Sequence, residues 1–242
     1  EPHPAAHGVR RRRSSVSTPQ KRPRQTPVIA TTSVEISAAD ARALSALHVR
    51  RTDNIGEATH LVAAHLARTE KMLVAIARGT VHIVTYDWIR AMVAAHSVVD
   101  AAPYALHDAA RESAWAMRLD DALARSRAHP GQLLAGHTFI YTRRIQPAVP
   151  VFRRIVEAAG GAAVPASGAA SARALASASG THHLVSCRDD RGAADKMAAQ
   201  YAAAAADYGA PTPLRVWTTE VVLSGVLRQE LVWASEFELA RE

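Results

Sequence analysis

Two cationic side chains lie three residues apart at the start of a predicted helix. The segment 69–78 (TEKMLVAIAR) has apolar residues at helical spacing, and Gly79 follows it where glycine commonly ends a helix. Arg68 and Lys71 share one face of this helix, whose N-terminus carries partial positive charge. The pattern therefore favours an anionic ligand, and the planar guanidinium of Arg68 suits a carboxylate. Taken alone, Lys71 is more typical of an exposed helix lysine.

The other polar residues give little support to catalysis. His182 and His183 are adjacent on a predicted strand, so their side chains point to opposite faces, and none of the twelve histidines has the spacing of metal ligands. We expect the pairs Asp120–Asp121 and Asp189–Asp190 to be solvated. Cys187 has no partner that marks a nucleophile, and no glycine-rich phosphate loop is present. We therefore expect a protein that is not an enzyme, with no catalytic residue, no metal site and no cofactor.

The positive charge of the chain is concentrated near its start. Residues 1–27 hold seven Lys and Arg residues against one acid, so they carry +6 of the formal net charge of +7. Few large apolar residues occur there, which predicts a disordered basic tail over 1–26. Its clusters at 10–13 and 21–24 have nuclear-import character, with a solvated charge run as the alternative. The remainder, at about +1, is not a basic DNA-binding body.

Two further features of the sequence limit the class of protein. A single cysteine excludes a disulfide framework and fits a reducing compartment. Because the chain begins with Glu1 rather than Met, we expect it to be part of a longer protein with further domains upstream.

From residue 27 onward, predicted strands and helices alternate, and the same order occurs twice. In the first unit we predict strands at 28–30, 48–49, 60–63 and 81–84 and helices at 38–47, 69–78 and 87–95. In the second unit we predict strands at 138–141, 162–164, 183–186 and 214–217 and helices at 151–159, 193–208 and 219–231. Strands alternating with helices indicate a mostly parallel sheet with helices on its faces.

Two segments fall outside this order. Residues 112–127 are amphipathic, with Trp115, Leu119 and Leu123 on one face, which predicts a linker helix packed between the two units. The Gly-, Ala- and Ser-rich run 166–180 predicts a flexible insertion in the second unit.

The residues at the ends of these elements resemble a tandem pair of BRCT repeats. In the first unit the resemblance is carried by 58–62 (ATHLV), 68–71 (RTEK) and 83–88 (IVTYDW), in which Trp88 is the signature core residue of the family. In the second unit it is carried by Gly160–Gly161 and by 217–227 (WTTEVVLSGVL), where Val221 stands in place of the usual Trp. The pattern covers roughly residues 27–242. It is most similar to the repeats of DNA-damage checkpoint mediators and of fungal multi-BRCT genome-maintenance scaffolds.

The resemblance implies an α/β fold of two BRCT repeats, each a small parallel four-stranded sheet flanked by helices, joined by a linker helix. The first repeat would span 27–106, a linker containing the helix 107–131, and the second repeat 132–242.

The resemblance also implies a phosphate pocket in the first repeat. A phosphoserine carries about −1.5 to −2 charge and three acceptor oxygens, so it needs a hydroxyl, a free backbone N–H and a cation. In the family's arrangement, Thr32 supplies the hydroxyl, Ser33 the N–H and Lys71 the ammonium. Most relatives have glycine where Ser33 stands. A register shifted by one residue would make Thr31 the hydroxyl donor instead.

A second group of residues would read the peptide beyond the phosphoserine. The resemblance places Arg68 at the seam between the repeats, against the peptide backbone or the C-terminal carboxylate about three residues after the phosphoserine. Gln146, Pro147 and Ser224 of the second repeat match positions that line this specificity pocket. For Gln146, an ordinary loop residue is an almost equal alternative.

These features together predict a nuclear scaffold fragment of the DNA-damage response that reads a phosphorylated Ser-Gln motif. The expected partner is the C-terminal tail of damage-phosphorylated histone 2A, with other repair proteins bound through upstream domains. One alternative is a phosphate-independent BRCT protein-interaction module, which the substitution at Ser33 favours. Another is DNA binding, at most a weak nucleic-acid contact, through the basic tail.

Overall fold

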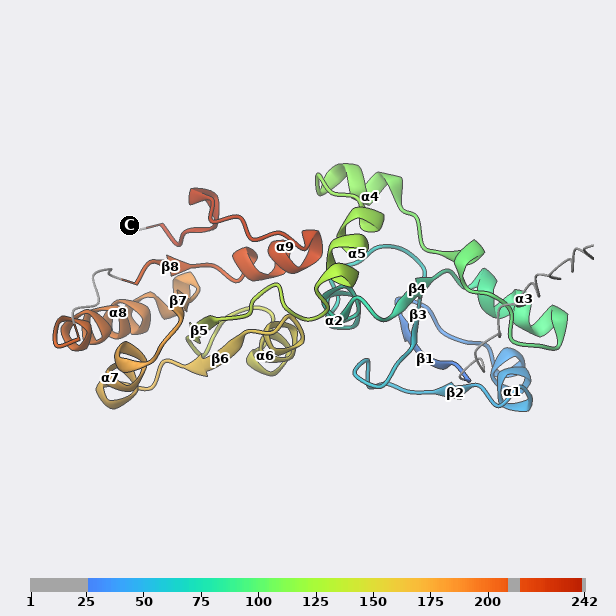
Figure 1. The fold of residues 1–242 in the computed structure, drawn as a ribbon, viewed down its shortest axis with the longest axis horizontal. Coiled ribbons are helices and arrows are strands. Elements are labelled where there is room, and N and C mark those ends of the chain that lie inside the picture. Colours follow the sequence, from blue (N-terminus) through green and yellow to red (C-terminus); the bar gives the residue numbers. More distant parts are fainter. Residues whose placement is uncertain (1–25, 209–213, 241–242) are drawn as a thin grey trace, which may run out of the picture.

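The protein folds into two α/β repeats that lie side by side, with short helices at the junction (Figure 1). The computed structural model describes residues 26–208 and 214–240. Residues 1–25 of the predicted disordered tail, which include both import clusters, therefore lie outside the described residues. Among the helices that are described, none is long and apolar enough to cross a membrane.

The first repeat is built on a parallel sheet in the order β2-β1-β3-β4. Its strands are β1 Val28–Thr32, β2 Arg50–Arg51, β3 His60–Ala63 and β4 His82–Val84. Its helices are α1 Ala38–Ala46, α2 Glu70–Arg78 and α3 Asp87–Ala95, followed by the turn η1 Ala102–Tyr104. The weak strand predicted at 48–49 begins two residues later, because His48 has a positive φ of 58° that is incompatible with a strand.

The second repeat repeats this topology in the order β6-β5-β7-β8. Its strands are β5 His137–Tyr141, β6 Ala162–Pro165, β7 Thr181–Val185 and β8 Val216–Trp217. Its helices are α6 Val149–Ala158, α7 Ala169–Ser177, α8 Arg191–Ala206 and α9 Glu220–Arg228, with the turns η2 Arg188–Asp190 and η3 Ser235–Phe237. The predicted α/β architecture of two four-stranded parallel sheets is confirmed.

The predicted flexible insertion at 166–180 is wrong, because it contains the helix α7. The run is rich in alanine, the residue with the highest helix propensity. Ala172 and Ala176 are buried, and α7 packs against α8. Small side chains thus allow two helices to approach closely, and composition alone did not show that a partner helix was available.

The single linker helix predicted at 112–127 is also wrong. The linker forms two helices, α4 Ala109–Ala114 and α5 Leu119–Ala128, separated at Trp115 and at Ala116, which has a positive φ of 46°. Leu119 and Leu123 are buried as predicted, while Trp115 caps the end of α4 and is only partly buried. All three side chains nevertheless belong to or pack against the same apolar core.

The pair Gly160–Gly161 follows α6 at a close contact between chain segments. Gly160 has a φ of 86°, and a Cβ at this position would lie 2.2 Å from the carbonyl oxygen of Gly131. A residue with a side chain would therefore be excluded both by its backbone conformation and by space.

The two repeats place a tryptophan against the sheet by different routes. In the first repeat Trp88 of α3 is fully buried and stacks on His60 of β3, with 4.3 Å between ring centroids. In the second repeat α9 has Val221 at the corresponding position. There Trp233, from the segment after α9, stacks on His183 of β7 with 4.1 Å between centroids and an angle of 18°. The ring that α9 lacks is thus supplied by the following segment.

We predict that Trp233→Ala destabilises the second repeat. Truncating a fully buried tryptophan to alanine lowers the free energy of unfolding by about 3–5 kcal/mol. Because Trp233 is only partly buried, we expect a decrease of about 2 kcal/mol. Urea unfolding followed by circular dichroism measures the change. Val232→Ala, at the neighbouring exposed residue (38% exposed), is the matched control and should change stability little. Equal stability of both variants would contradict the proposed replacement.

Buried histidines make the stability depend on pH. Burial lowers the pKa of His60 and that of His183 to about 4, and a neighbouring histidine adds to the effect in each repeat. The unfolded chain, with histidine pKa values near 6.5, therefore binds more protons than the folded chain between about pH 6.5 and 4. The free energy of unfolding should decrease as pH falls through this window.

We predict a loss of stability between pH 7 and pH 5, at most about 1.4 kcal/mol per pH unit for each of the two histidines below the unfolded pKa. Urea unfolding at a series of pH values measures it. His60→Asn removes one titrating group, so its curve should be flatter even though its stability at pH 7 is lower. A wild-type protein whose stability is constant from pH 7 to pH 5 would show that the two side chains are not held neutral by burial.

Candidate functional site

Helix α2 of the first repeat is the element against which both repeats pack. It contacts α6 and α9 of the second repeat and α5 of the linker. One continuous apolar core runs through these helices and includes Leu73, Ile76, Leu123, Phe152 and Val222. The predicted seam, formed by the second helix of the first repeat and the first and last helices of the second, is confirmed. The N-terminus of α2 is consequently held at a fixed position relative to the second repeat.

The N-terminus of α2 meets the end of strand β1 through two hydroxyl groups. Thr69 caps the helix, and its side chain accepts a hydrogen bond from the backbone N–H of Met72 at 3.3 Å. The hydroxyl of Thr32 lies 2.9 Å from the hydroxyl of Thr69, and Thr32 is 8% exposed. Thr31 is the preceding strand residue, so its side chain points to the opposite face of the sheet. The geometry places Thr32, and not Thr31, beside the helix terminus.

Ser33, the residue directly after β1, has a left-handed backbone conformation. It is exposed and has a φ of 55°, in the left-handed region where glycine has no steric penalty. The backbone turns here between β1 and the loop that leads to α1. The conformation expected for the family's glycine is therefore kept with serine in its place.

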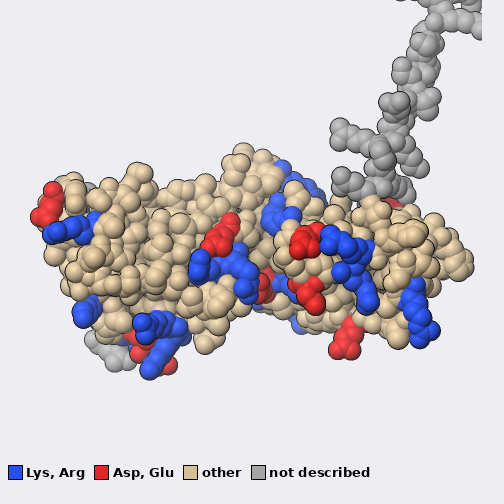
Figure 2. Space-filling model, turned by 90° about the horizontal axis from the view of Figure 1, so that it is seen from below, with Lys and Arg blue, Asp and Glu red and all other residues tan. Residues whose placement is uncertain are grey.

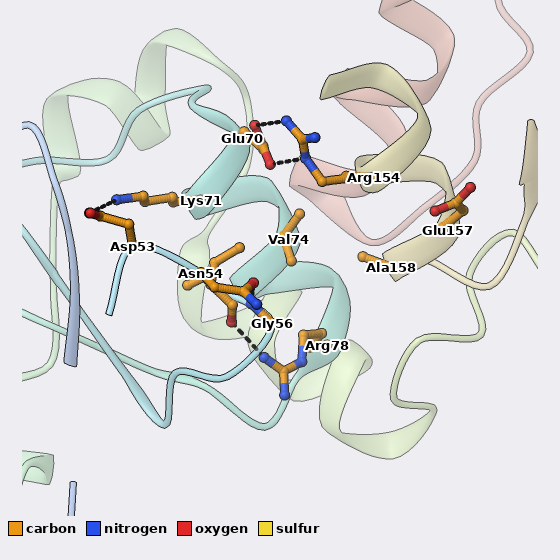
Figure 3. A pocket seen from close by; sticks show the side chains of 11 residues that line it. Asp53, Asn54, Gly56, Glu70, Lys71, Val74, Arg78, Arg154, Glu157 and Ala158 are labelled. Atoms are coloured by element: carbon orange, nitrogen blue, oxygen red, sulfur yellow. Dashed lines mark hydrogen bonds and ion pairs between the residues drawn. The ribbon is translucent and has the colours of Figure 1, made fainter. Parts of the chain in front are cut away.

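Lys71 lies in the first turn of α2 and has a weak partner. Its Nζ is 3.3 Å from Oδ1 of Asp53, in the loop between β2 and β3 (Figure 3). The Asp53 side chain is fully exposed and the Lys71 side chain is 28% exposed, so solvent screens the pair. An ammonium group has three donors, of which this contact uses one. Lys71 therefore keeps the capacity to bind a further anion.

Arg68 forms an ion pair with the second repeat. Its Nη2 lies 2.6 Å from Oε2 of Glu220, the first residue of α9, and the hydroxyl of Ser224 donates to the same carboxylate at 3.4 Å. The structure thus joins two of the predicted specificity residues through an acid that the sequence did not single out. The Arg68 side chain is 31% exposed, so part of its guanidinium faces solvent.

The loop with Gln146 and Pro147 lies next to this ion pair. The hydroxyl of Thr219, directly before Glu220, donates to the carbonyl oxygen of Gln146, and the Gln146–Pro147 peptide bond is cis. The side chain of Gln146 is exposed and Pro147 is half-buried. The predicted residues of the second repeat are therefore near one another, at the edge of the seam where Arg68 lies.

A further ion pair across the seam was not foreseen. Glu70 accepts two hydrogen bonds from Arg154 of α6, at 2.5 and 2.9 Å (Figure 3). The hydrogen bond to Glu70 is the largest of the causes that raise the pKa of Arg154. Thr69 was identifiable as a helix cap from its place before the apolar run. In contrast, the pairing of Glu70 with Arg154, like that of Arg68 with Glu220, joins residues far apart in the sequence and has no local signal.

The second repeat has a different arrangement after its first strand. Asp190 was predicted to be solvated, but its side chain is 13% exposed and accepts a hydrogen bond from the backbone N–H of Arg144 at 2.7 Å. The carboxylate of Asp190 thus accepts the hydrogen bond of a backbone N–H in the loop after β5, which an anionic ligand would otherwise accept. Within residues 26–208 and 214–240, no group of three His, Cys, Asp or Glu side chains is arranged to hold a metal ion.

The fold and the seam define a class of protein, and comparison with known proteins agrees. The family model described as Regulator of Ty1 transposition protein 107 BRCT domain matches residues 10–106. The family model described as BRCT domain matches residues 132–238. The chain carries two BRCT domains in tandem and belongs to the BRCT family.

Several curated relatives share part of the chain. BRCT-containing protein 1 of Schizosaccharomyces pombe is 35% identical over 120 residues, which are 49% of this chain and 14% of that protein. Mediator of DNA damage checkpoint protein 1 of Homo sapiens is 32% identical over 130 residues, which are 54% of this chain and 6% of that protein. The match thus spans a small part of each relative's length.

Solved structures show the same arrangement of two repeats. The BRCT5–BRCT6 domains of Brc1 from S. pombe superpose with a TM-score of 0.69 at 27% identity, covering 88% of this chain and 99% of that one. A complex of Rtt107p with phosphorylated histone 2A superposes with a TM-score of 0.62 at 10% identity, covering 92% and 96%. The second likeness concerns the fold alone.

Proposed function

We propose that the chain binds a phosphoserine peptide at the N-terminus of α2. The observation that carries the proposal is the convergence of Thr32, the capping residue Thr69 and the cation Lys71 at one end of a helix whose body is buried between the repeats. A phosphate accepts hydrogen bonds from hydroxyl and ammonium groups and is favoured by a helix N-terminus. Thr32 and Ser33 would hold it from the strand side, and Lys71 from the helix side.

The peptide that we propose is a phosphorylated Ser-Gln motif near a C-terminus, such as the tail of histone 2A. Arg68 lies three residues before Lys71, directly before the helix cap, and presents a guanidinium at the seam, where a carboxylate a few residues after the phosphoserine would reach it. Gln146, Pro147 and Ser224 would border this end of the peptide. The complex of the structural neighbour Rtt107p with phosphorylated histone 2A supports this choice of ligand. The module would act in a nuclear scaffold of the DNA-damage response, and its relatives' names support that setting.

Two alternatives remain distinguishable by experiment. Lys71 and Arg68 already have acidic partners, Asp53 and Glu220, which is compatible with a module that binds proteins independently of phosphate. Figure 2 shows Lys and Arg residues next to Asp and Glu residues on one face, with no continuous basic area on that face. DNA binding would therefore depend on the tail. It should weaken strongly with salt and disappear on removal of residues 1–25.

We predict that Lys71→Ala abolishes the preference for a phosphorylated over an unphosphorylated histone 2A tail peptide. Loss of a charge-assisted hydrogen bond worth roughly 1.5–3 kcal/mol should weaken phosphopeptide binding about 10- to 100-fold. Isothermal titration calorimetry measures both affinities. Lys196→Ala, at an exposed lysine of α8, is the matched control and should bind as wild type does. Unchanged phosphopeptide affinity in Lys71→Ala would remove the pocket assignment.

We predict that amidation of the peptide's C-terminus weakens its binding to wild type about tenfold, because a partly exposed guanidinium–carboxylate pair contributes about 1–2 kcal/mol. Arg68→Ala should bind the free and amidated peptides equally. Arg90→Ala, at a remote exposed arginine, should retain the wild-type difference. Glu220→Gln removes the competing carboxylate and should increase the difference. Equal affinity of wild type for both peptides would indicate an internal phosphorylation site and exclude the histone tail.

A further inference from the structure

A cleft of about 760 Å³ lies between the repeats and opens beside Lys71 (Figure 3). One wall is formed by α2 and by the loop between β2 and β3, and the other wall by α6. Its lining includes the charged residues Asp53, Lys71 and Arg78 and the apolar residues Ile55 and Val74. Its size is within the range of ligand sites, and it requires both repeats to be present.

The floor of the cleft is apolar, and one end is shared with the proposed phosphate site. Ile55 and Val74 are each 5% exposed and provide the floor, with Ala158 on the facing helix. Lys71 belongs to both the cleft and the phosphate site. A peptide bound with its phosphoserine at Lys71 would therefore have this cleft directly beside it.

Arg78 is the one charged residue lining the cleft that has no ion-pair partner among the described residues. Within the cleft, Asp53 pairs with Lys71 and Glu70 with Arg154, while Glu157 pairs with Arg153, which does not line the cleft. Arg78 instead donates from Nη1 to the backbone carbonyl oxygen of Ile55 at 2.7 Å. This bond fixes a half-buried guanidinium that forms no ion pair with a carboxylate among the described residues. Such a group suits a planar anion from a ligand.

The spacing of the two cations sets the spacing of the ligand's anions. Lys71 and Arg78 are seven residues apart on α2 and so lie on the same helix face, separated along the axis by about 10 Å. An extended peptide covers about 3.3 Å per residue, so about three residues bridge this distance. The residues after the phosphoserine are assigned to Arg68 and α9, which leaves the cleft for the residues before it.

We propose that the cleft is a second specificity site that takes the peptide segment preceding the phosphoserine and selects an acidic side chain about three residues before it. Arg78 binds the acid, and the floor of Ile55 and Val74 contacts the residues between the two anions. This inference rests on the proposed phosphopeptide function and adds a requirement on the ligand sequence. A peptide with an acid at this position is bound at both ends of α2, by Lys71 and by Arg78.

The test uses fluorescent phosphoserine peptides of one sequence that carry Asp or Ala at the second, third or fourth position before the phosphoserine. For wild type we expect Asp at one of these positions to improve affinity about fivefold, the upper range for a solvent-accessible ion pair. In Arg78→Gln, which keeps a donor for the Ile55 carbonyl, the improvement should disappear while the preference for phosphate persists. Arg90→Gln, the control variant, removes one positive charge outside the cleft, and it should still bind the Asp-containing peptide more tightly than the Ala-containing peptide.

The outcomes separate this inference from the proposed function. If Asp gives no advantage at any of the three positions, or if its advantage survives in Arg78→Gln, the cleft assignment is overturned while phosphate-dependent binding stands. If wild type does not distinguish phosphorylated from unphosphorylated peptides, both assignments are overturned. Thermal unfolding of each variant shows whether the fold is retained.

Discussion

The burial of helix α2 between the two repeats is the constraint on which the rest of the structure depends. Six consecutive residues of this helix, 72–77, are buried, which is unusual for a nine-residue helix of one small domain. They are covered on one side by their own sheet and on the others by α5, α6 and α9. Neither repeat could expose these surfaces to water without losing the apolar contacts, so the two BRCT repeats pack as one structural unit.

The same burial concentrates the polar chemistry at the ends of α2. Because the middle of the helix is apolar, the charged residues lie at its two ends: Arg68 directly before the capping Thr69, Glu70 and Lys71 in the first turn, and Arg78 at the last position. Two of these residues, Arg68 and Glu70, pair with the second repeat and fix the relative position of the repeats. The side chains of the other two, Lys71 and Arg78, hydrogen-bond to Asp53 and to the carbonyl oxygen of Ile55, and they are the cations that we propose to bind the ligand.

The two repeats differ at the positions that correspond to the proposed phosphate site. The first repeat keeps the tryptophan of its last helix and an open turn after its first strand, at Ser33. The second repeat supplies the equivalent tryptophan from another segment, as Trp233, and closes the turn after its first strand with Asp190. It thereby keeps the sheet packing that supports the seam, while a backbone N–H after its first strand is already hydrogen-bonded to a carboxylate of the same repeat.

The sequence by itself determined the α/β class, the twofold order of elements, the boundaries of α2 and α3 and the family, because apolar periodicity, helix caps and the motif around Trp88 are local patterns. It also placed Thr32, Arg68 and Lys71 at the ends of the correct elements. Only the tertiary structure decided that Glu220 and Arg154 meet the first repeat, that Trp233 replaces a missing ring and that 169–177 is a helix. Each depends on contacts between residues distant in the chain, and a local pattern carries no information about which distant surface will cover it.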